Sequence, residues 1–185
     1  MASGSRSGSI IVHSTSSNKV EYRADNVFAQ VCGLCYLLNS SLVACGYDEE
    51  FDDEGPFLKV FSLSLELGQT LVGHDSIVWC VTVSPSGSHF AFGGSDGKVM
   101  IWSESGEGCE WARVQVLADH TGWIVAVCFS PDGKQLVAGS YDDLINQPLQ
   151  LQRGKCHLSA HVGGPHPLRL FPLVLSRLQT LLLGK

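Results

Sequence analysis

Histidine and aspartate recur in this sequence at a fixed separation. His74 precedes Asp96 by 22 residues, and His120 precedes Asp142 by the same number. A histidine beside a carboxylate is the base-and-orienter arrangement of many hydrolases, so each pair has the residue types for catalysis. Both pairs occupy one repeat position, and no motif links either of them to a serine or cysteine nucleophile. We therefore interpret them as structural and predict a protein that is not an enzyme, with no catalytic residue.

Cysteines and acidic residues supply the other groups that could bind a metal ion. Cys32 and Cys35 form a lone CxxC motif, which needs a second pair for zinc or a strand-to-helix context for redox chemistry. On a strand, residues three apart point to opposite faces, so separate thiols are favoured. The acidic run at 48–54 lacks the spacing of a calcium loop and indicates a solvated turn. The Cys/His group at 156–161 is a looser metal candidate, and we predict no metal and no cofactor.

The two histidines open segments that align without gaps and that indicate strands joined by turns. A Ser-Pro-x-Gly turn begins 10 residues after each histidine, at Ser84 and Ser130. Proline presets φ at such a turn, and glycine accepts positive φ. Asp96-Gly97 is a strong hairpin signal between two apolar segments. The histidines are 46 residues apart, close to the period of about 40–45 residues of a four-stranded propeller blade.

These residues resemble the WD-repeat family. The marks are Gly73-His74 at the start, Ser95-Asp96-Gly97 at the turn, and Trp102-Ser103 where the family usually has Trp-Asp. The resemblance is strong for residues 71–103 and 117–143, and weaker copies precede them from residue 2. It implies an all-β fold, an incomplete β-propeller built from four-stranded antiparallel blades.

A break in composition divides the chain at residue 143. All 18 acidic residues lie at or before Asp143, whereas residues 144–185 carry five basic residues and no acidic one. Pro148 removes a ladder donor where the next strand would run. We predict a WD-repeat region at 1–143 and a divergent, poorly ordered tail at 144–185 that is irregular or partly helical. The predicted units of the first region are a half blade (1–24), a degenerate blade (25–67), a blade (68–117) and a partial blade (118–143).

The resemblance also implies a role for the recurring polar residues. In the family, the start histidine, the turn aspartate and the strand tryptophan join one hydrogen-bonded network per blade, usually with a serine or threonine. The corresponding residues here are His74, Asp96 and Trp102 in one blade, and His120 and Asp142 in the next. Phe92 and Ala138 occupy the serine position, so we expect both networks to be incomplete. The second copy also lacks the tryptophan, and we expect its blade to be the less stable of the two.

Composition and charge limit the classes of function. The net charge is −6, and an acidic body lacks the basic surface that binds nucleic acid, so we predict no nucleic-acid partner. No apolar run reaches membrane-spanning length, so we predict no membrane partner. Residues 1–8 have no apolar signal-peptide core, and the seven cysteines show no disulfide framework. These features predict a cytoplasmic protein with reduced thiols, a nuclear location being the alternative.

The resemblance implies function through binding. Propeller rings present loop-lined faces to other proteins, so we predict a scaffold or adaptor for protein–protein interaction within a larger propeller. Trp79, Trp123 and Tyr141 are candidate anchors, because exposed aromatic residues dominate interface energetics. The alternative for the two tryptophans is packing between blades. The predicted partners are other proteins and further propeller blades, from a longer parent chain or from a partner.

Two other classes of function stay open. One is the propeller segment of a multidomain signalling protein or enzyme complex whose active domain lies outside this chain. Neighbouring coding sequence would separate this class from a simple adaptor. The other is a metal-binding protein that uses its cysteines and histidines, which elemental analysis would detect.

Overall fold

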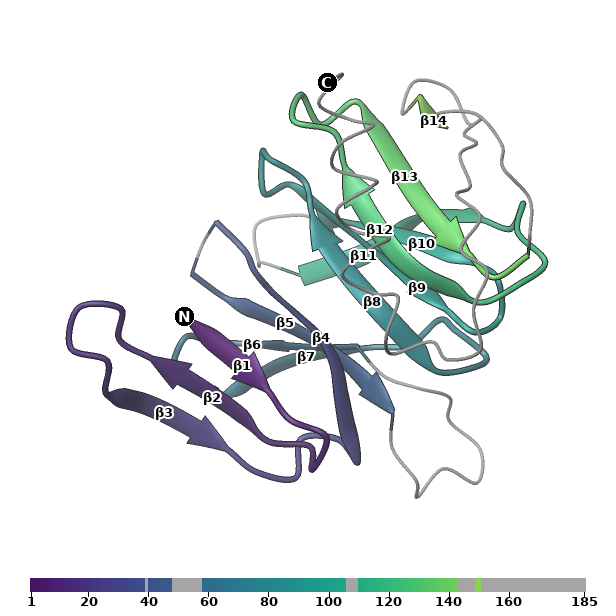
Figure 1. The fold of residues 1–185 in the computed structure, drawn as a ribbon. Coiled ribbons are helices and arrows are strands. Elements are labelled where there is room, and N and C mark those ends of the chain that lie inside the picture. The colour runs from purple at the N-terminus through teal and green to yellow at the C-terminus, as the bar shows by residue number, and fades with distance from the viewer. Residues whose placement is uncertain (39, 48–57, 106–109, 143–148, 151–185) are drawn as a thin grey trace.

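The computed structural model describes residues 1–38, 40–47, 58–105, 110–142 and 149–150 (Figure 1). Within these ranges every element of regular secondary structure is a β-strand, and every strand pair is antiparallel. The predicted all-β class is therefore confirmed for the described part of the chain. None of its described residues belongs to a helix that could cross a membrane.

The strands form four sheets, each a meander of consecutive strands. The first sheet contains β1 (Ala2–Gly4), β2 (Ile10–His13) and β3 (Val20–Ala24). The second contains β4 (Gln30–Tyr36), β5 (Leu42–Tyr47), β6 (Leu58–Phe61) and β7 (Leu67–Leu71). The third contains β8 (Val78–Val83), β9 (His89–Gly94), β10 (Val99–Ser105) and β11 (Glu110–Leu117). The fourth contains β12 (Ile124–Phe129), β13 (Gln135–Ser140) and β14 (Leu149–Gln150).

Successive sheets stack on one another in an arc, as propeller blades do (Figure 1). The first strand of each sheet contacts its neighbour: β1 contacts β4, β4 contacts β8, and β8 contacts β12. The first and fourth sheets lie at opposite ends of the arc in Figure 1. The prediction of an incomplete propeller made of four-stranded antiparallel blades is confirmed in the part that the structure describes.

The apolar cores lie between neighbouring sheets. On β9, Phe90 and Phe92 pack against the second sheet, whereas Ala91 packs against the fourth. Successive side chains of a strand point to opposite faces, so a strand between two sheets must be apolar on both. All three side chains are almost completely buried. Each blade therefore depends on its neighbours for order.

A side-chain amide adds a polar link between the second and third sheets. The Gln69 Nε2 donates to the Trp111 carbonyl at 3.1 Å, and the Trp111 N–H donates to the Gln69 Oε1 at 2.9 Å. The amide of Gln69 on β7 thus satisfies both backbone groups of one residue on β11. Trp111 is itself buried in the core between the two sheets.

The predicted turns are formed. Gly87 and Gly133 close the two Ser-Pro-x-Gly turns with φ of 71° and 70°, and their N–H groups donate to the Ser84 and Ser130 carbonyls. Gly97 has φ of 74° in the β9–β10 hairpin. Such positive values are strained for most residues with a side chain, so glycine is favoured there. At Gly97 a Cβ would also lie 2.6 Å from the His120 carbonyl oxygen.

β14 lies in the segment for which the sequence predicts an irregular or partly helical tail. Leu149 pairs with Leu136, and Gln150 pairs with Gln135, at the outer edge of β13. The rest of the predicted tail, including the Cys/His group at 156–161, lies outside the described residues. The acidic run at 48–54 lies outside them as well.

Candidate protein-interaction site

The first His–Asp pair joins a loop to a hairpin turn at one end of the third sheet. The His74 Nδ1 lies 2.7 Å from the Asp96 Oδ1, with the histidine side chain fully buried. Gly94 makes room for this contact, because a Cβ there would lie 2.6 Å from the His74 Nδ1. The pair therefore fixes the loop before β8 against the turn after β9.

Asp96 stays ionised in this environment. Burial acts to raise the pKa of Asp96, but the hydrogen bond and charge of His74 act to lower it. The backbone N–H groups of Lys98 and Asp75 also donate to the Asp96 carboxylate. The balance holds the pKa of Asp96 below its ordinary value. An ionised carboxylate that accepts these bonds favours the proton on the His74 Nδ1.

Trp102 is not hydrogen-bonded to this pair, although the resemblance implies a network of all three residues. The Trp102 Nε1 and the His74 Nε2 are both buried without a hydrogen-bond partner among the described residues. The Phe92 ring packs against both side chains, its centroid 4.8 Å from that of His74 and 6.1 Å from that of Trp102. A phenyl ring has neither a lone pair nor a polar hydrogen to link them. The network therefore ends at the His–Asp pair.

The second His–Asp pair repeats this geometry in the fourth sheet. The His120 Nδ1 lies 2.7 Å from the Asp142 Oδ2, and the Thr121 N–H donates to the same carboxylate oxygen at 3.1 Å. Equivalent loops are thus held in the same way in two sheets. We continue to interpret the pairs as structural supports for the neighbouring surface.

The three candidate anchor residues form one aromatic cluster at this end of the molecule. Trp79 and Trp123 stack with their ring centroids 6.0 Å apart and an interplanar angle of 23°. Tyr141 meets Trp123 edge-on at 6.3 Å and 85°. Because Trp79 belongs to the third sheet and the other two flank strands of the fourth, the cluster bridges two blades. We call Trp79, Trp123 and Tyr141 the aromatic patch.

Local backbone features aim these rings. Trp79 is the extra residue of a β-bulge, since Val78 pairs with Gly94 and Cys80 with Gly93. Bulges commonly redirect a side chain. The Trp79 Nε1 donates to the Ser95 Oγ at 2.6 Å, which fixes the indole. The sequence analysis named Ser95 as a turn residue but did not identify it as the hydrogen-bond partner of Trp79. Its alignment with Tyr141 in the next repeat is the signal that marks it.

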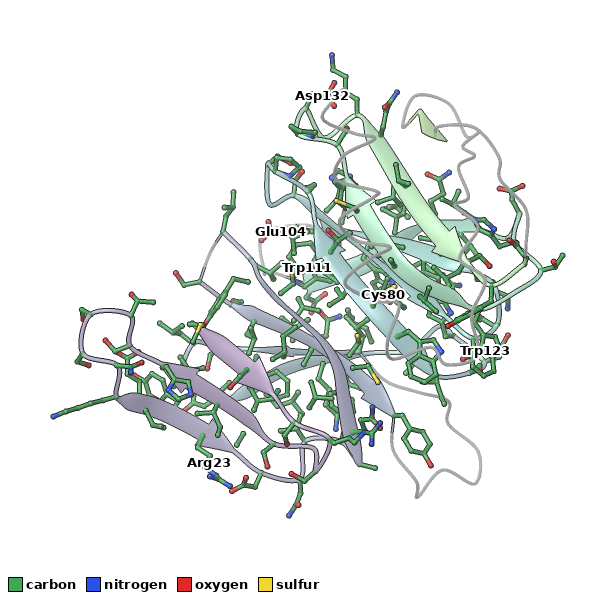
Figure 2. The ribbon with its side chains drawn as sticks, in the orientation of Figure 1. Arg23, Cys80, Glu104, Trp111, Trp123 and Asp132 are labelled. Atoms are coloured by element: carbon green, nitrogen blue, oxygen red, sulfur yellow. The ribbon has the colours of Figure 1, made fainter. Side chains whose placement is uncertain are left out.

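Trp123 gives the patch its accessible surface. It is 45% exposed, whereas Trp79 and Tyr141 are partly buried. Figure 2 shows Trp123 at the edge of the molecule, at the opposite end of the fourth sheet from Asp132. The stacking with Trp79 means that the tryptophans also pack between blades. Interblade packing and an exposed aromatic surface therefore occur together.

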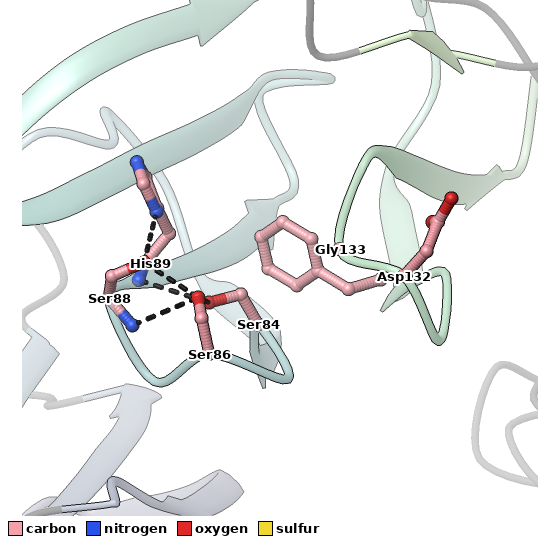
Figure 3. A pocket seen from close by; sticks show the side chains of 7 residues that line it. Ser84, Ser86, Ser88, His89, Asp132 and Gly133 are labelled. Carbon is pink, nitrogen blue, oxygen red and sulfur yellow. Dashed lines mark hydrogen bonds between the residues drawn. The ribbon is translucent and has the colours of Figure 1, made fainter.

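The opposite end of these sheets carries a polar cleft of about 260 Å³ (Figure 3). Hydroxyl groups form a chain along its wall, from Ser84 to Ser86 at 3.1 Å and from Ser86 to Ser88 at 2.7 Å. The Ser88 Oγ lies 2.9 Å from the His89 Nδ1. In the equivalent turn Asp132 accepts from the Ser130 hydroxyl at 2.6 Å. The serines thus support a tight turn as the carboxylate does.

Burial favours the protonated form of the cysteines that the structure describes. Burial raises the pKa of Cys32 to about 11 and that of Cys80 to about 12. Burial also raises the pKa of Cys35, which lies on β4 with Cys32. A thiol held protonated is a poor nucleophile and metal ligand. The described residues contain no group of three His, Cys, Asp or Glu side chains placed to hold a metal ion.

The segments that carry the two His–Asp pairs match a known family, described as WD domain, G-beta repeat, at residues 65–103 and 111–146. These two segments are WD repeats. The resemblance seen in the sequence is thereby confirmed, and the sheets that hold the aromatic patch are WD-repeat blades. WD repeats imply a protein-interaction scaffold, and their usual role is not catalytic.

Relatives share the repeats over part of their length. A probable cytosolic iron-sulfur protein assembly protein 1 of Sclerotinia sclerotiorum is 40% identical over 110 residues, which is 57% of this chain and 23% of that protein. Its namesake in Botryotinia fuckeliana is 41% identical over 102 residues, 52% of this chain and 22% of that protein. Human apoptotic protease-activating factor 1 is 40% identical over 86 residues, 44% of this chain and 7% of that protein. The chain thus spans less than a quarter of each relative.

Proposed function

We propose that this chain is a scaffold segment that binds partner proteins through the aromatic patch. One observation carries the proposal. The histidines, aspartates and turn residues recur in both repeats, whereas each residue of the aromatic patch occurs in one repeat alone. At the positions equivalent to Trp79, Trp123 and Tyr141, the other repeat has Val125, Ile77 and Ser95. The blade fold therefore does not require these rings. An exposed tryptophan that the fold does not require is available for binding.

Protein capture tests this proposal. The immobilised full chain is incubated with cytosolic extract, and bound proteins are quantified by mass spectrometry for the wild type and two variants. Trp123→Ile installs the residue of the other repeat, and Tyr22→Ala removes an exposed aromatic ring from the first sheet as a matched control. We expect discrete proteins that Trp123→Ile loses and Tyr22→Ala retains. Equal capture by all three proteins would contradict the proposal.

More specifically, we propose that this scaffold takes part in the assembly of cytosolic iron–sulfur proteins in the cytoplasm. Supporting it is the length of the match with the fungal relatives, which covers 57% of the chain against 44% for the human protease-activating factor. We expect depletion of the protein to lower the activity of cytosolic iron–sulfur enzymes. If those enzymes are unaffected, the alternative of a propeller segment in a multidomain signalling protein is favoured instead.

Further propeller blades are the second kind of partner that we propose. The described sheets form an arc in which the packed strand pairs join only successive sheets, whereas closed propellers typically have about 4–8 blades. Light scattering coupled to size exclusion would show a complex heavier than the 19.9 kDa chain when the chain is co-purified from cells. A monomeric, fully folded chain would contradict blade pairing.

A further inference from the structure

We propose that the aromatic patch binds an arginine side chain on a basic segment of a partner protein. This inference rests on the proposed function, since it specifies the chemistry of the partner at the same patch. Three observations carry it: the shape of the aromatic surface, the charge around it, and the way the fold holds both in place.

The rings present a flat, electron-rich surface. Trp79 and Trp123 stack at a small angle, and Trp123 is 45% exposed. The face of an indole attracts cations more strongly than the faces of other aromatic side chains. A guanidinium is planar and stacks on such a face, whereas an ammonium is more strongly hydrated. The geometry therefore suits arginine better than lysine.

Carboxylates outnumber cations in the loops that surround the patch. In the described loops and turns at this end of the third and fourth sheets, the exposed carboxylates are Asp75 and Asp119, and Lys98 is the ammonium. Asp96 and Asp142 are largely buried and are paired with His74 and His120. Lys98 is already held by Asp75 at 2.6 Å and by Asp96 at 3.7 Å. The excess of negative charge favours a cationic partner over a neutral or acidic one.

Asp75 supplies the hydrogen-bond acceptor that an arginine needs. It lies four residues before Trp79, on the loop that enters β8, and its side chain is 77% exposed. Its Oδ2 accepts from the Lys98 ammonium, so a guanidinium N–H would donate to the Oδ1 of the same carboxylate. A ring surface for stacking and a carboxylate for hydrogen bonding thus belong to adjoining parts of one loop and strand.

The site is held in place before any partner arrives. The hydrogen bond to Ser95 fixes the Trp79 ring, and the backbone bond from Tyr141 to the Trp123 carbonyl, at 3.1 Å, fixes the turn before β12. A rigid surface loses little conformational entropy on binding. The apolar alternative, a proline or leucine segment, would gain nothing from the surrounding carboxylates.

The test uses the folded full chain and three capped peptides of the same length. One is a glycine–arginine repeat, the second replaces arginine with citrulline, which is neutral and nearly isosteric, and the third replaces it with lysine. Tryptophan fluorescence and calorimetry measure binding. We expect the arginine peptide to bind about tenfold more tightly than the citrulline peptide, and more tightly than the lysine peptide.

Variants locate the binding on the patch. Trp123→Ile and Asp75→Asn should each weaken binding of the arginine peptide several-fold, whereas Tyr22→Ala should leave it unchanged. Circular dichroism confirms folding, and Asp75→Asn keeps the test decisive if Trp123→Ile does not fold. Equal affinity for the arginine and citrulline peptides, or full affinity in Asp75→Asn, would overturn the arginine proposal. A third outcome separates the two proposals: the chain captures partner proteins that Trp123→Ile loses, but binds the three peptides equally. That result would refute arginine recognition and would still support the scaffold function.

Discussion

The buried contact of Phe92 with two unpartnered polar groups gives a direct test of how this blade is stabilised. Phe92 is 1% exposed, so Phe92→Ala should cost about 3–5 kcal/mol through lost burial and a cavity. Adding a hydroxyl to a core ordinarily costs a further 1–3 kcal/mol, roughly, because that group is left unpaired. Here Phe92→Ser should behave in the opposite way.

The reason lies in the chemistry of the two unpartnered groups. The Trp102 Nε1–H can donate to a serine oxygen, and the serine O–H can donate to the His74 Nε2. Two new hydrogen bonds at about 1 kcal/mol each should make Phe92→Ser about 1–2 kcal/mol more stable than Phe92→Ala. Trp102→Phe removes the donor, so in that background the advantage should fall by about one hydrogen bond.

Urea denaturation of the variants, followed by circular dichroism, measures these differences. The comparison between serine and alanine cancels most of the cavity term, which is why the pair is more informative than either variant alone. If the Phe92→Ser protein is no more stable than the Phe92→Ala protein, the reasoning is refuted, because a hydroxyl at this position then does not complete the hydrogen-bonded network.

Three further predictions concern the links between blades and turns. Gln69→Ala should lower the free energy of unfolding by about 1–3 kcal/mol, because both backbone groups of Trp111 lose their partner. Gln69→Glu keeps one acceptor and should lower the free energy of unfolding by less. Equal losses in the two variants would argue against the paired link. Gly97→Ala should cost at least about 1–3 kcal/mol in thermal unfolding, since φ is 74° and a Cβ would lie 2.6 Å from the His120 carbonyl oxygen, and wild-type stability would contradict this. The lowered pKa of Asp96 contributes stability that is present above the ordinary aspartate pKa and is lost as pH falls through the lower value in the folded protein. Asp96→Asn should therefore reduce the loss of stability at acid pH. An unchanged loss in this variant would exclude Asp96 as a cause.

The repeat architecture could be predicted from the residues because its determinants are local. Turn glycines, the Ser-Pro pairs and the recurring histidines each act within one blade, at spacings that the chain displays directly. The His–Asp contacts at 2.7 Å join residues 22 positions apart in both repeats, so one alignment predicts both. Local spacing gives no such information about which residues of different blades meet.

The aromatic patch shows what only tertiary structure decides. Trp79 and Trp123 occupy different repeat positions, so no alignment indicates that their rings stack. The hydrogen bonds from Gln69 to Trp111 likewise join edges of separate sheets, 42 residues apart. By itself the sequence determined the blades, their turns and their internal pairs, because these depend on short segments. The stacking of blades decided which side chains meet across sheets and which polar groups stay unpaired, because those contacts depend on the relative orientation of whole sheets.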